Sequence, residues 1–423
     1  MIAIFLVIAL PPAAAFAQET AATADAALDS RAADVVAAIN GEKDPEEIFG
    51  PAFLAAVPPA QFEAFTRQIT GQFGAAKAVQ LVDPTGQNSA QIAIRFERAI
   101  AGGTITLDPA SPHLIVGLLL SKFDPVDDSA DKIEADLMAL PGEVTAYFGP
   151  LDGSSPMLSI GSDRRLALGS TFKLFALSAL AHSVERGEIR WSDVHSLERR
   201  SFPSGQMQNW PQGAPVTLHT LASMMISISD NTATDQLMAL LPESAIGAEL
   251  ARSGADNDPR NTPWLDTLSL FALKGNGDLA SAFEAGSEAE QHALVARIRA
   301  QSGGDPEKVE PPRFTSPTAI DTIEWFASPA ELRRLLARLA ELSDPTAREI
   351  MSINPSLPAA EQGNWNYIGF KGGSEPGVIN LTWLLQDFDG RWYILTMGWN
   401  DPASPVDETA FELLAQRVIA LSR

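Results

Sequence analysis

Strand patterns at two distant places constrain the fold of this 423-residue chain more than any other feature. Segments rich in apolar and aromatic residues, typical of strands, occur at 142–149, 156–161, 366–373, 378–388 and 391–399. Between the two groups, a largely helical pattern runs from Ser170 to about Leu342. Strands on both sides of a helical middle are expected to share one sheet. We therefore predict an α+β domain whose antiparallel sheet is built from both chain ends, with a helical subdomain between them.

A smaller unit is expected before this domain. Residues 58–73 repeat apolar side chains with helical spacing, and residues 91–98 alternate apolar and polar side chains as a strand does. Helices followed by strands predict a small α+β domain. The expected order is a signal peptide at 1–17, a flexible lead at 18–31, the small domain at 32–123, a polar linker at 124–129 and the larger domain at 130–423.

The first 17 residues form a candidate export signal. An apolar run, interrupted by Pro11-Pro12, leads to Ala15-Phe16-Ala17, which matches the small-residue pattern of a signal-peptidase site. The run is short for a membrane span and has no basic residue ahead of it, so an uncleaved anchor is the alternative. Cleavage after Ala17 predicts a periplasmic or secreted protein with no stable membrane insertion.

Composition argues against several classes of function. The net charge of −23 opposes binding to nucleic acid or to an anionic membrane, so we expect neither as a partner. The chain has no cysteine, which excludes disulfides, a cysteine nucleophile and thiolate metal sites. The five histidines lack metal-ligand spacing, and neither G-x-G-x-x-G nor a P-loop occurs. We therefore expect no metal and no cofactor.

Two further groups of polar residues are expected to be structural or solvent-facing. The sequence contains no G-x-S-x-G elbow, and the histidines stand outside the motifs described below, so a Ser-His-Asp triad has no support. Arg333, Arg334 and Arg338 fall on one amphipathic helical pattern, and we expect them to form a solvated face. The histidines are His113, His182, His195, His219 and His292.

The most informative short segment is Ser170-Thr-Phe-Lys173, at the start of an apolar helical pattern that ends near Gly187. Positions three apart share a helix face, so Lys173 is expected beside Ser170. Apolar neighbours desolvate an ammonium and lower its pKa, and a neutral lysine can take the proton of a serine hydroxyl. The helix N-terminus also offers N–H groups to a developing oxyanion. The alternative is an interior helix whose lysine extends to water.

The same four-residue pattern occurs once more and serves as an internal control. Ser129-Ala-Asp-Lys132 follows Asp127 and Asp128, at a polar helix start. There the serine is expected to be an N-cap, and the carboxylates are expected to keep the lysine charged. The pattern alone is therefore too short to identify a nucleophile.

Two downstream segments add to the first. Ser229-Asp230-Asn231 joins two helical patterns, where it can face a cleft or simply cap the second helix. The segment Lys371-Gly372-Gly373-Ser374 follows an aromatic strand. Its glycines allow close approach of a ligand to the backbone, and a strand-end turn or a bulge is the alternative.

Taken in order, S-x-x-K, S-D-N and K-G-G resemble the motif set of class A β-lactamases, members of the serine penicillin-recognising superfamily. The resemblance covers residues 130–423 and extends to "SFPSGQMQNWPQG", "MMISISDNTATDQL" and "WYILTMGWN". The layout of the whole chain is similar to the fused proteins of clavulanic-acid clusters. In those proteins a cystatin/NTF2-like or ketosteroid-isomerase-like domain precedes a β-lactamase/transpeptidase-like domain. This resemblance implies that residues 32–123 form such a domain.

The resemblance implies roles for the reacting residues. Ser170 would be the nucleophile that accepts the acyl group, and Lys173 would be its base. Ser229 would relay a proton to the leaving group. The backbone N–H groups of Ser170 and Ser374 would form the oxyanion hole.

It also implies substrate-binding roles. Asn231 would hold the lysine of the first motif and the side-chain amide of the substrate, and Lys371 would attract a substrate carboxylate. Gly372 and Gly373 would line the strand beside the substrate. The family has a hydroxyl at the position of Gly372, and Ser374 is the candidate replacement.

A second departure concerns hydrolysis of the acyl-enzyme. Class A enzymes carry a water-activating glutamate in an E-x-x-L-N segment, and none occurs between Asn231 and Pro312. Four glutamates in that region lack the context, namely Glu243, Glu249, Glu284 and Glu288. We therefore predict an active-site serine hydrolase with weak or absent classical β-lactamase turnover, acting on a small-molecule β-lactam, ester or amide. The alternatives are a D,D-peptidase or transpeptidase acting on peptides and a non-catalytic ligand-binding protein.

Overall fold

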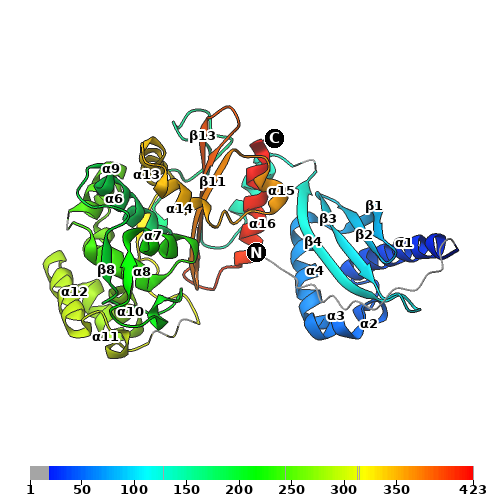
Figure 1. The fold of residues 1–423 in the computed structure, drawn as a ribbon, viewed down its shortest axis with the longest axis horizontal. Coiled ribbons are helices and arrows are strands. Elements are labelled where there is room, and N and C mark those ends of the chain that lie inside the picture. The colour runs from blue at the N-terminus through cyan, green and yellow to red at the C-terminus, as the bar shows by residue number, and fades with distance from the viewer. Residues whose placement is uncertain (1–18, 127, 243, 312, 314, 423) are drawn as a thin grey trace. The chain divides into compact units, whose positions relative to one another are not determined.

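The computed structural model describes residues 19–422 except residues 127, 243, 312 and 314, and for residues 19–25 and 359–360 only the backbone (Figure 1). The predicted signal peptide at residues 1–17 lies outside the described residues. The chain forms two compact units, Met1–Ile133 with Thr409–Arg423, and Glu134–Glu408. No helix among the described residues is both long and apolar enough to cross a membrane.

The first unit is a four-stranded antiparallel sheet with helices against it, as the order of sequence patterns predicts. The flexible lead expected at 18–31 is wrong, because a helix begins at Glu19 and Leu28 is buried in the core. The sheet order is β1-β2-β3-β4. The apolar side chains of residues 58–73 that face inward pack with the alternating residues of β2 in one core. The likeness of this unit to cystatin or ketosteroid-isomerase domains stays a prediction. Its elements are α1 (Glu19–Ile39), α2 (Pro45–Ile48), α3 (Pro51–Ala56), α4 (Pro59–Phe73), β1 (Ala76–Gly86), β2 (Ser89–Phe96), β3 (Ala99–Leu107) and β4 (Ile115–Pro125).

The C-terminal helix α16 (Glu408–Ile419), followed by η6 (Ala420–Ser422), is grouped with the first unit, although we expected it in the larger domain. Leu413 belongs to the apolar core of the first unit. Arg417 donates two hydrogen bonds to Asp128, with Nε–Oδ2 2.7 Å and Nη2–Oδ1 3.0 Å, and the side-chain exposures are 2% and 9%. A buried bidentate ion pair of this kind fixes the helix to the segment before α5 (Ala130–Met138).

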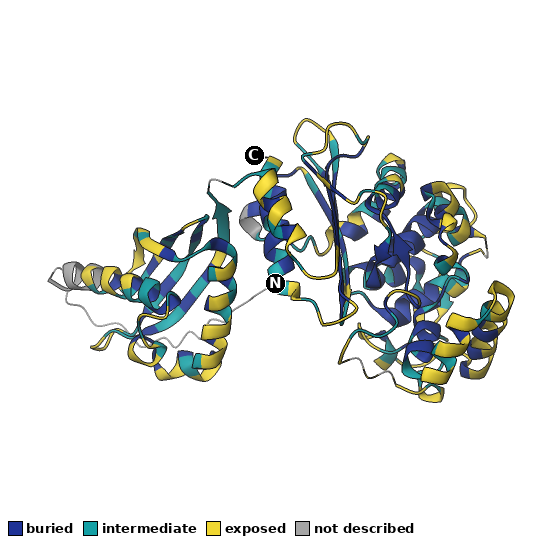
Figure 2. Cartoon of the chain, turned by 180° about the vertical axis from the view of Figure 1, so that it is seen from behind, coloured by how far each residue is buried: buried dark blue, intermediate teal, exposed yellow. Residues whose placement is uncertain are grey.

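The second unit contains the predicted sheet from both ends of its chain. Its strands are antiparallel in the order β11-β12-β13-β5-β6, so strands from the two distant groups meet where β13 pairs with β5. Figure 2 shows that buried residues concentrate between this sheet and the neighbouring helices. The strands are β5 (Glu143–Pro150), β6 (Leu158–Ile160), β11 (Tyr367–Glu375), β12 (Val378–Gln386) and β13 (Trp392–Asn400).

The middle of the second unit is helical, as predicted. Helix α6 is central, because all but a few of its side chains are buried, and it ends before Gly187, whose φ is 73°. The middle elements are β7 (Leu166–Ala167), η1 (Gly169–Phe172), α6 (Lys173–Glu185), β8 (Val194–Ser196), η2 (Met207–Asn209), β9 (Pro215–Thr217), α7 (Leu218–Ser227), α8 (Asn231–Leu240), α9 (Ala245–Ser253), η3 (Ala255–Asn257), η4 (Pro259–Asn261), α10 (Thr267–Gly275), α11 (Gly277–Ala285), α12 (Glu288–Ser302), η5 (Pro306–Lys308), β10 (Phe326–Ala327), α13 (Pro329–Glu341), α14 (Thr346–Ser352) and α15 (Ala359–Gln362).

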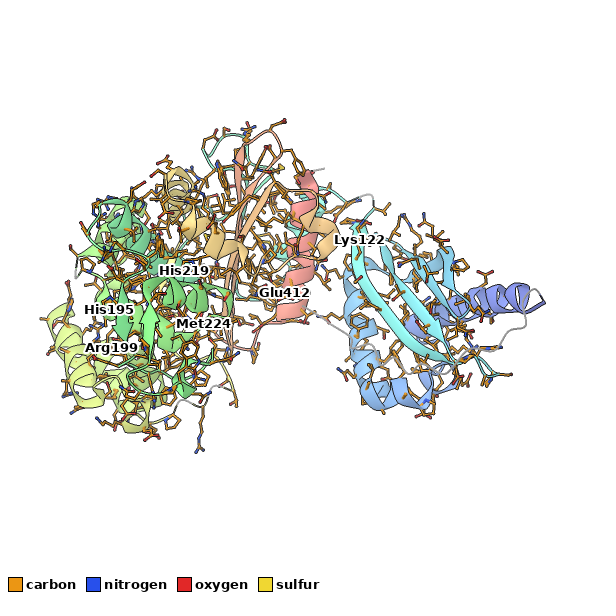
Figure 3. The ribbon with its side chains drawn as sticks, in the orientation of Figure 1. Lys122, His195, Arg199, His219, Met224 and Glu412 are labelled. Carbon is orange, nitrogen blue, oxygen red and sulfur yellow. The ribbon has the colours of Figure 1, made fainter. Side chains whose placement is uncertain are left out.

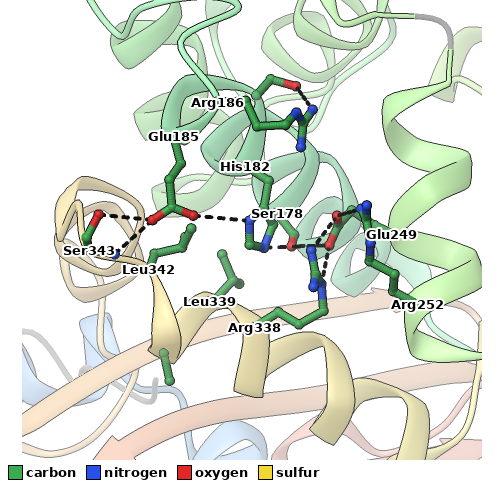
Figure 4. A network of polar contacts seen from close by, with 12 residues as sticks. Ser178, His182, Glu185, Arg186, Glu249, Arg252, Arg338, Leu339, Leu342 and Ser343 are labelled. Carbon is green, nitrogen blue, oxygen red and sulfur yellow. Dashed lines mark hydrogen bonds and ion pairs between the residues drawn. The ribbon is translucent and has the colours of Figure 1, made fainter.

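One expectation about α13 is wrong. Arg338 does not belong to a solvated face, because its guanidinium donates to both oxygens of buried Glu249, each at 3.0 Å (Figure 4). The Ser178 hydroxyl donates to the same carboxylate at 2.7 Å, and Arg252 donates at 3.1 Å. Burial raises the pKa of Glu249, but the hydrogen bonds from Arg338 and Ser178 outweigh it, and the net pKa is lowered. This glutamate is a structural link between α6, α9 and α13.

Candidate functional site

Ser170 lies in η1, where a tight turn leads into the central helix. Gly169 has φ 49°, and a Cβ atom there would lie 3.0 Å from the Ser374 nitrogen, so both the conformation and the space favour glycine. Lys173 then begins α6 one helical turn after Ser170. Ser170 is partly exposed, and its hydroxyl has no hydrogen-bond partner among the described residues. The hydroxyl is therefore available to a ligand.

The amine of Lys173 is fully buried and fixed by the second motif. Its Nζ donates to the Ser229 carbonyl at 2.6 Å and to Asn231 Oδ1 at 2.6 Å, and it lies 3.1 Å from Ser229 Oγ. No hydrogen bond joins it to the Ser170 hydroxyl in the described structure. Nζ thus has three oxygen neighbours. A neutral amine, which has two N–H donors, would donate to the two carbonyl oxygens and accept from the Ser229 hydroxyl.

Lys371 of β11 contacts the same hydroxyl. Its Nζ lies 3.1 Å from Ser229 Oγ and also donates to the Gly372 carbonyl. The Ser229 hydroxyl therefore bridges the two buried amines, Lys173 and Lys371. No carboxylate within the described part of the chain forms an ion pair with either amine. A hydroxyl between two amines can pass a proton from one to the other.

The environment lowers the proton affinity of both lysines. Burial lowers the pKa of Lys173 well below its usual range, and the neighbouring Lys371 lowers it further, against the opposing effect of Asp235 and Asp230. Burial also lowers the pKa of Lys371 to about 7. Two ammonium groups this close, without carboxylate partners, disfavour simultaneous protonation.

The turn before α8 presents Ser229 and Asn231 while Asp230 holds it in place. Asp230 accepts from the Ala233 backbone at 2.8 Å, which caps α8, and from the Gln206 backbone at 2.6 Å. Ser229 has φ 59°, a left-handed conformation that costs a non-glycine residue about 1 kcal/mol or more. The sequence left open whether this segment caps α8 or faces a cleft, and it does both. Asp230 caps the helix, and Ser229 and Asn231 contact Lys173.

The third motif approaches the first through its backbone. A Cβ atom at Gly373 would clash with the Ser170 nitrogen and the Leu168 carbonyl, so only glycine allows β11 to lie this close to η1. Gly372 faces the other side of the strand, where a Cβ atom would lie 2.8 Å from the Phe370 ring. Gly373 is thus placed beside the serine, whereas Gly372 is not.

A cavity of about 260 Å³ opens at these segments. Of the predicted residues it is lined by Ser170, Asn231 and Ser374, whereas Lys173, Lys371 and Ser229 are not among its lining residues. Trp325 also lines it and stacks on Phe172, with ring centroids 3.5 Å apart. The cavity has room for a small acyl group next to the serine hydroxyl.

The histidines take no part in this cavity. His195 lies on β8 and His219 on α7 (Figure 3), and the His219 side chain is exposed. His182 lies between Glu185 and Glu249, 3.7 Å and 3.9 Å away (Figure 4). These placements agree with structural or surface roles.

Sequence reasoning missed a buried charge cluster in the cavity wall. Lys274 of α10 donates to Glu324 Oε1 at 2.9 Å and also to Glu375 at the end of β11. Both glutamates line the cavity together with Ser170. Glu375 directly follows Ser374 of the third motif, and this adjacency could have indicated that it is a site residue. Glu324 lies beyond the region in which a glutamate was sought.

The Ser129 pattern differs from the Ser170 pattern in the way the sequence predicts. The Lys132 backbone donates to Ser129 Oγ at 3.3 Å, so this serine caps α5. Lys132 is solvent-exposed, whereas Lys173 is completely buried. Burial and partners, rather than the four-residue pattern, separate the two sites.

Three similar solved structures are PBP-A (17% identity, TM-score 0.48, 69% of this chain and 93% of that chain), a β-lactamase from Sphaerobacter thermophilus DSM 20745 (21%, 0.49, 70% and 94%) and an ancestral class A β-lactamase (19%, 0.46, 69% and 96%). No curated protein matches the chain significantly. The model of the β-lactamase enzyme family matches residues 128–355, more than half of the chain. The chain therefore belongs to the β-lactamase enzyme family.

Proposed function

We propose that this protein is a serine hydrolase that forms an acyl-enzyme on Ser170 with a small β-lactam, ester or amide substrate. The observation that carries this proposal is the buried amine of Lys173, which has no carboxylate partner among the described residues and is held by Ser229 and Asn231. An uncompensated buried ammonium is costly, so the neutral amine is favoured. A neutral amine one turn from a serine is suited to act as a base.

In the acylation step, Ser170 Oγ attacks the carbonyl carbon and Lys173 Nζ accepts the hydroxyl proton. The tetrahedral intermediate then collapses, the bond from carbon to the leaving nitrogen or oxygen breaks, and the leaving group takes a proton through Ser229. The acyl group remains on Ser170 as an ester. Because Ser229 Oγ lies 3.1 Å from both lysine nitrogens, it supplies a short path for this proton.

Substrate binding would use the edge of β11. The N–H groups of Ser170 and Ser374 are the proposed oxyanion donors, and the packing at Gly169 and Gly373 supports their closeness. Lys371, when protonated, would attract a substrate carboxylate. Ser374 is exposed and lines the cavity, so its hydroxyl can replace the one that the family has at the position of Gly372.

Classical β-lactamase turnover is expected to be weak. The E-x-x-L-N glutamate is missing. Glu249, one of the four glutamates considered in its place, accepts a hydrogen bond from Arg338 and does not line the cavity. Esters, which acylate a serine more readily than amides do, are therefore the first substrates to test.

The test is intact-protein mass spectrometry after treatment with a fluorescent penicillin and with p-nitrophenyl acetate. We expect a mass increase of one acyl group located at Ser170, and none there in Ser170→Ala. The matched control is Ser129→Ala, which removes the serine of the second S-x-x-K pattern and should leave labelling unchanged. Labelling with turnover supports the hydrolase, and a stable penicillin adduct supports a peptidase. Absence of any adduct at Ser170 contradicts both and favours a ligand-binding protein.

We also propose that residues 1–17 direct export and are removed. The apolar run and the Ala15-Phe16-Ala17 site support this proposal. Sequencing the N-terminus of the cell-derived protein should give Gln18 as the first residue, and an intact Met1 would contradict cleavage.

A further inference from the structure

The cavity wall contains a buried cluster of one amine and two carboxylates. Lys274 and Glu324 have side-chain exposures of 0% and 1%, and Glu375 keeps 13%. The three residues come from different elements, namely α10, the segment before β10, and the end of β11. One ammonium can neutralise only one of the two carboxylates, so the cluster holds either an excess negative charge or an extra proton.

Glu375 has a defined position relative to the nucleophile. Alternate residues of a strand face the same side, so Lys371, Gly373 and Glu375 share one face of β11. On this face Lys371 contacts Ser229, and Gly373 contacts the backbone of Ser170. Glu375 is the next residue of the row and lines the cavity together with Ser170. The strand thus places a lysine on one side of the serine and a carboxyl group on the other.

The charges around Glu375 suit proton transfer near neutral pH. Burial and the adjacent Glu324 carboxylate raise the pKa of Glu375 to about 8, against the opposing effect of Lys274. Burial lowers the pKa of Lys274, but its two carboxylate neighbours outweigh this effect, so the amine stays charged. A base with a pKa close to the working pH accepts and releases a proton readily.

Glu249, a carboxylate in a structural ion pair, differs from Glu375 in its partners, its pKa and its place. Each oxygen of Glu249 accepts a hydrogen bond from Arg338, its pKa is lowered, and it lies outside the cavity. Glu375 shares one amine with a second carboxylate and lies on the cavity wall.

We propose that Glu375, positioned by Lys274 and Glu324, is the general base that activates the water for hydrolysis of the acyl group on Ser170. This inference rests on the proposed acyl-enzyme. The water oxygen bonds to the acyl carbon while the Glu375 carboxylate takes a water proton. The bond from the acyl carbon to Ser170 Oγ then breaks, the serine oxygen takes the proton that Glu375 removed from water, and the acyl group leaves as a carboxylic acid.

The test separates acylation from hydrolysis with a p-nitrophenyl ester. The initial burst of p-nitrophenolate reports acylation, and the following steady rate reports hydrolysis of the acyl-enzyme. Glu375→Gln is expected to keep the burst and to lower the steady rate about 100-fold or more, so that the Ser170 adduct accumulates. Glu249→Gln makes the same chemical change in a buried carboxylate outside the cavity, and it should leave both phases unchanged.

The pH dependence gives a second readout, which a purely structural role would not change. Glu375 acts only when ionised, so the steady rate should rise as pH increases through about 8. Glu324→Gln removes the neighbouring negative charge and should shift this midpoint down by about one pH unit. If Glu375→Gln does not fold, this shift still tests whether Glu375 is the general base.

Two results overturn the assignment alone, given that the unsubstituted protein shows a burst and an adduct. One is an unchanged steady rate in folded Glu375→Gln, and the other is a midpoint that Glu324→Gln does not move. Absence of a burst and of a Ser170 adduct in the unsubstituted protein overturns the proposed function, and the assignment with it.

Discussion

Two buried polar clusters of the second unit differ in whether the charged form of their ionisable groups is stabilised. Around Glu249, two arginines and a serine hydroxyl compensate one carboxylate, and the charged form is stabilised (Figure 4). Around Ser229, two lysines share a hydroxyl and have no carboxylate partner among the described residues, so the charged form is destabilised. Compensated charge holds helices together, whereas uncompensated charge creates a reactive base.

The largest effect expected from this comparison is on acylation. Lys173→Met keeps the volume and removes the base, so the rate of Ser170 acylation should fall about 1,000-fold. The free energy of unfolding should change little, because the lost hydrogen bonds are offset by removal of a poorly solvated amine. Stopped-flow burst kinetics and urea denaturation measure the two quantities. A loss of acylation smaller than about tenfold would remove Lys173 from the role of base.

The opposite pattern is expected at the compensated cluster. Glu249→Ala leaves Arg338 without its partner and should lower the free energy of unfolding by about 3 kcal/mol. The acylation rate per folded molecule should not change, since Glu249 does not line the cavity. Denaturation midpoints and burst kinetics at low temperature test this. A large loss of acylation in fully folded Glu249→Ala would show that the Glu249 cluster is not purely structural.

A substitution at Ser229 is expected to lower the acylation rate and to raise the free energy of unfolding. Ser229→Gly removes the bridging hydroxyl and should lower the acylation rate about 100-fold. Glycine tolerates the positive φ of this position, so the free energy of unfolding should rise by about 0.5–1 kcal/mol. Paired kinetic and denaturation measurements on this one variant check both signs. A variant that loses stability would show that the hydroxyl contributes more to folding than the strain costs.

The smallest expected effect concerns Lys371. Its pKa of about 7 means that the ammonium form disappears as pH rises. The KM for an ester that carries a carboxylate should therefore increase about tenfold between pH 6 and 8, while a neutral ester should show no such increase. Lys371→Met should abolish the difference. Equal pH profiles for the two esters in the unsubstituted protein would contradict a carboxylate-binding role.

Much of the architecture could be predicted because it depends on local patterns. Strand periodicity in two distant segments predicted the shared sheet, and helical spacing after Ser170 predicted the central helix. The grouping of α16 with the first unit could not be predicted. It depends on a buried pair between Arg417 and Asp128, 289 residues apart, and no local pattern reports such a contact.

The sequence predicted which motif residues form the candidate site. It did not predict which buried charges have partners of opposite sign. Spacing placed Lys173 with Ser170, but only the structure shows that its amine lies with Ser229 and Asn231. Arg338 was misread because helical periodicity cannot tell a solvated guanidinium from one paired with a buried carboxylate. Glu324 and Glu375 were missed for the same reason, since their meeting at Lys274 joins three distant segments.

The central claim is that Lys173 is neutral at neutral pH and accepts the Ser170 proton. Its most direct test is the pH dependence of the single-turnover acylation rate, with a neutral ester so that Lys371 has no carboxylate to bind. A neutral Lys173 should give a rate that is already level at neutral pH, declines with one proton in acid, and is lost in Lys173→Met. A rate that climbs through about pH 10, as an ordinary lysine would give, or one that survives in Lys173→Met, would show that Lys173 is not the neutral base.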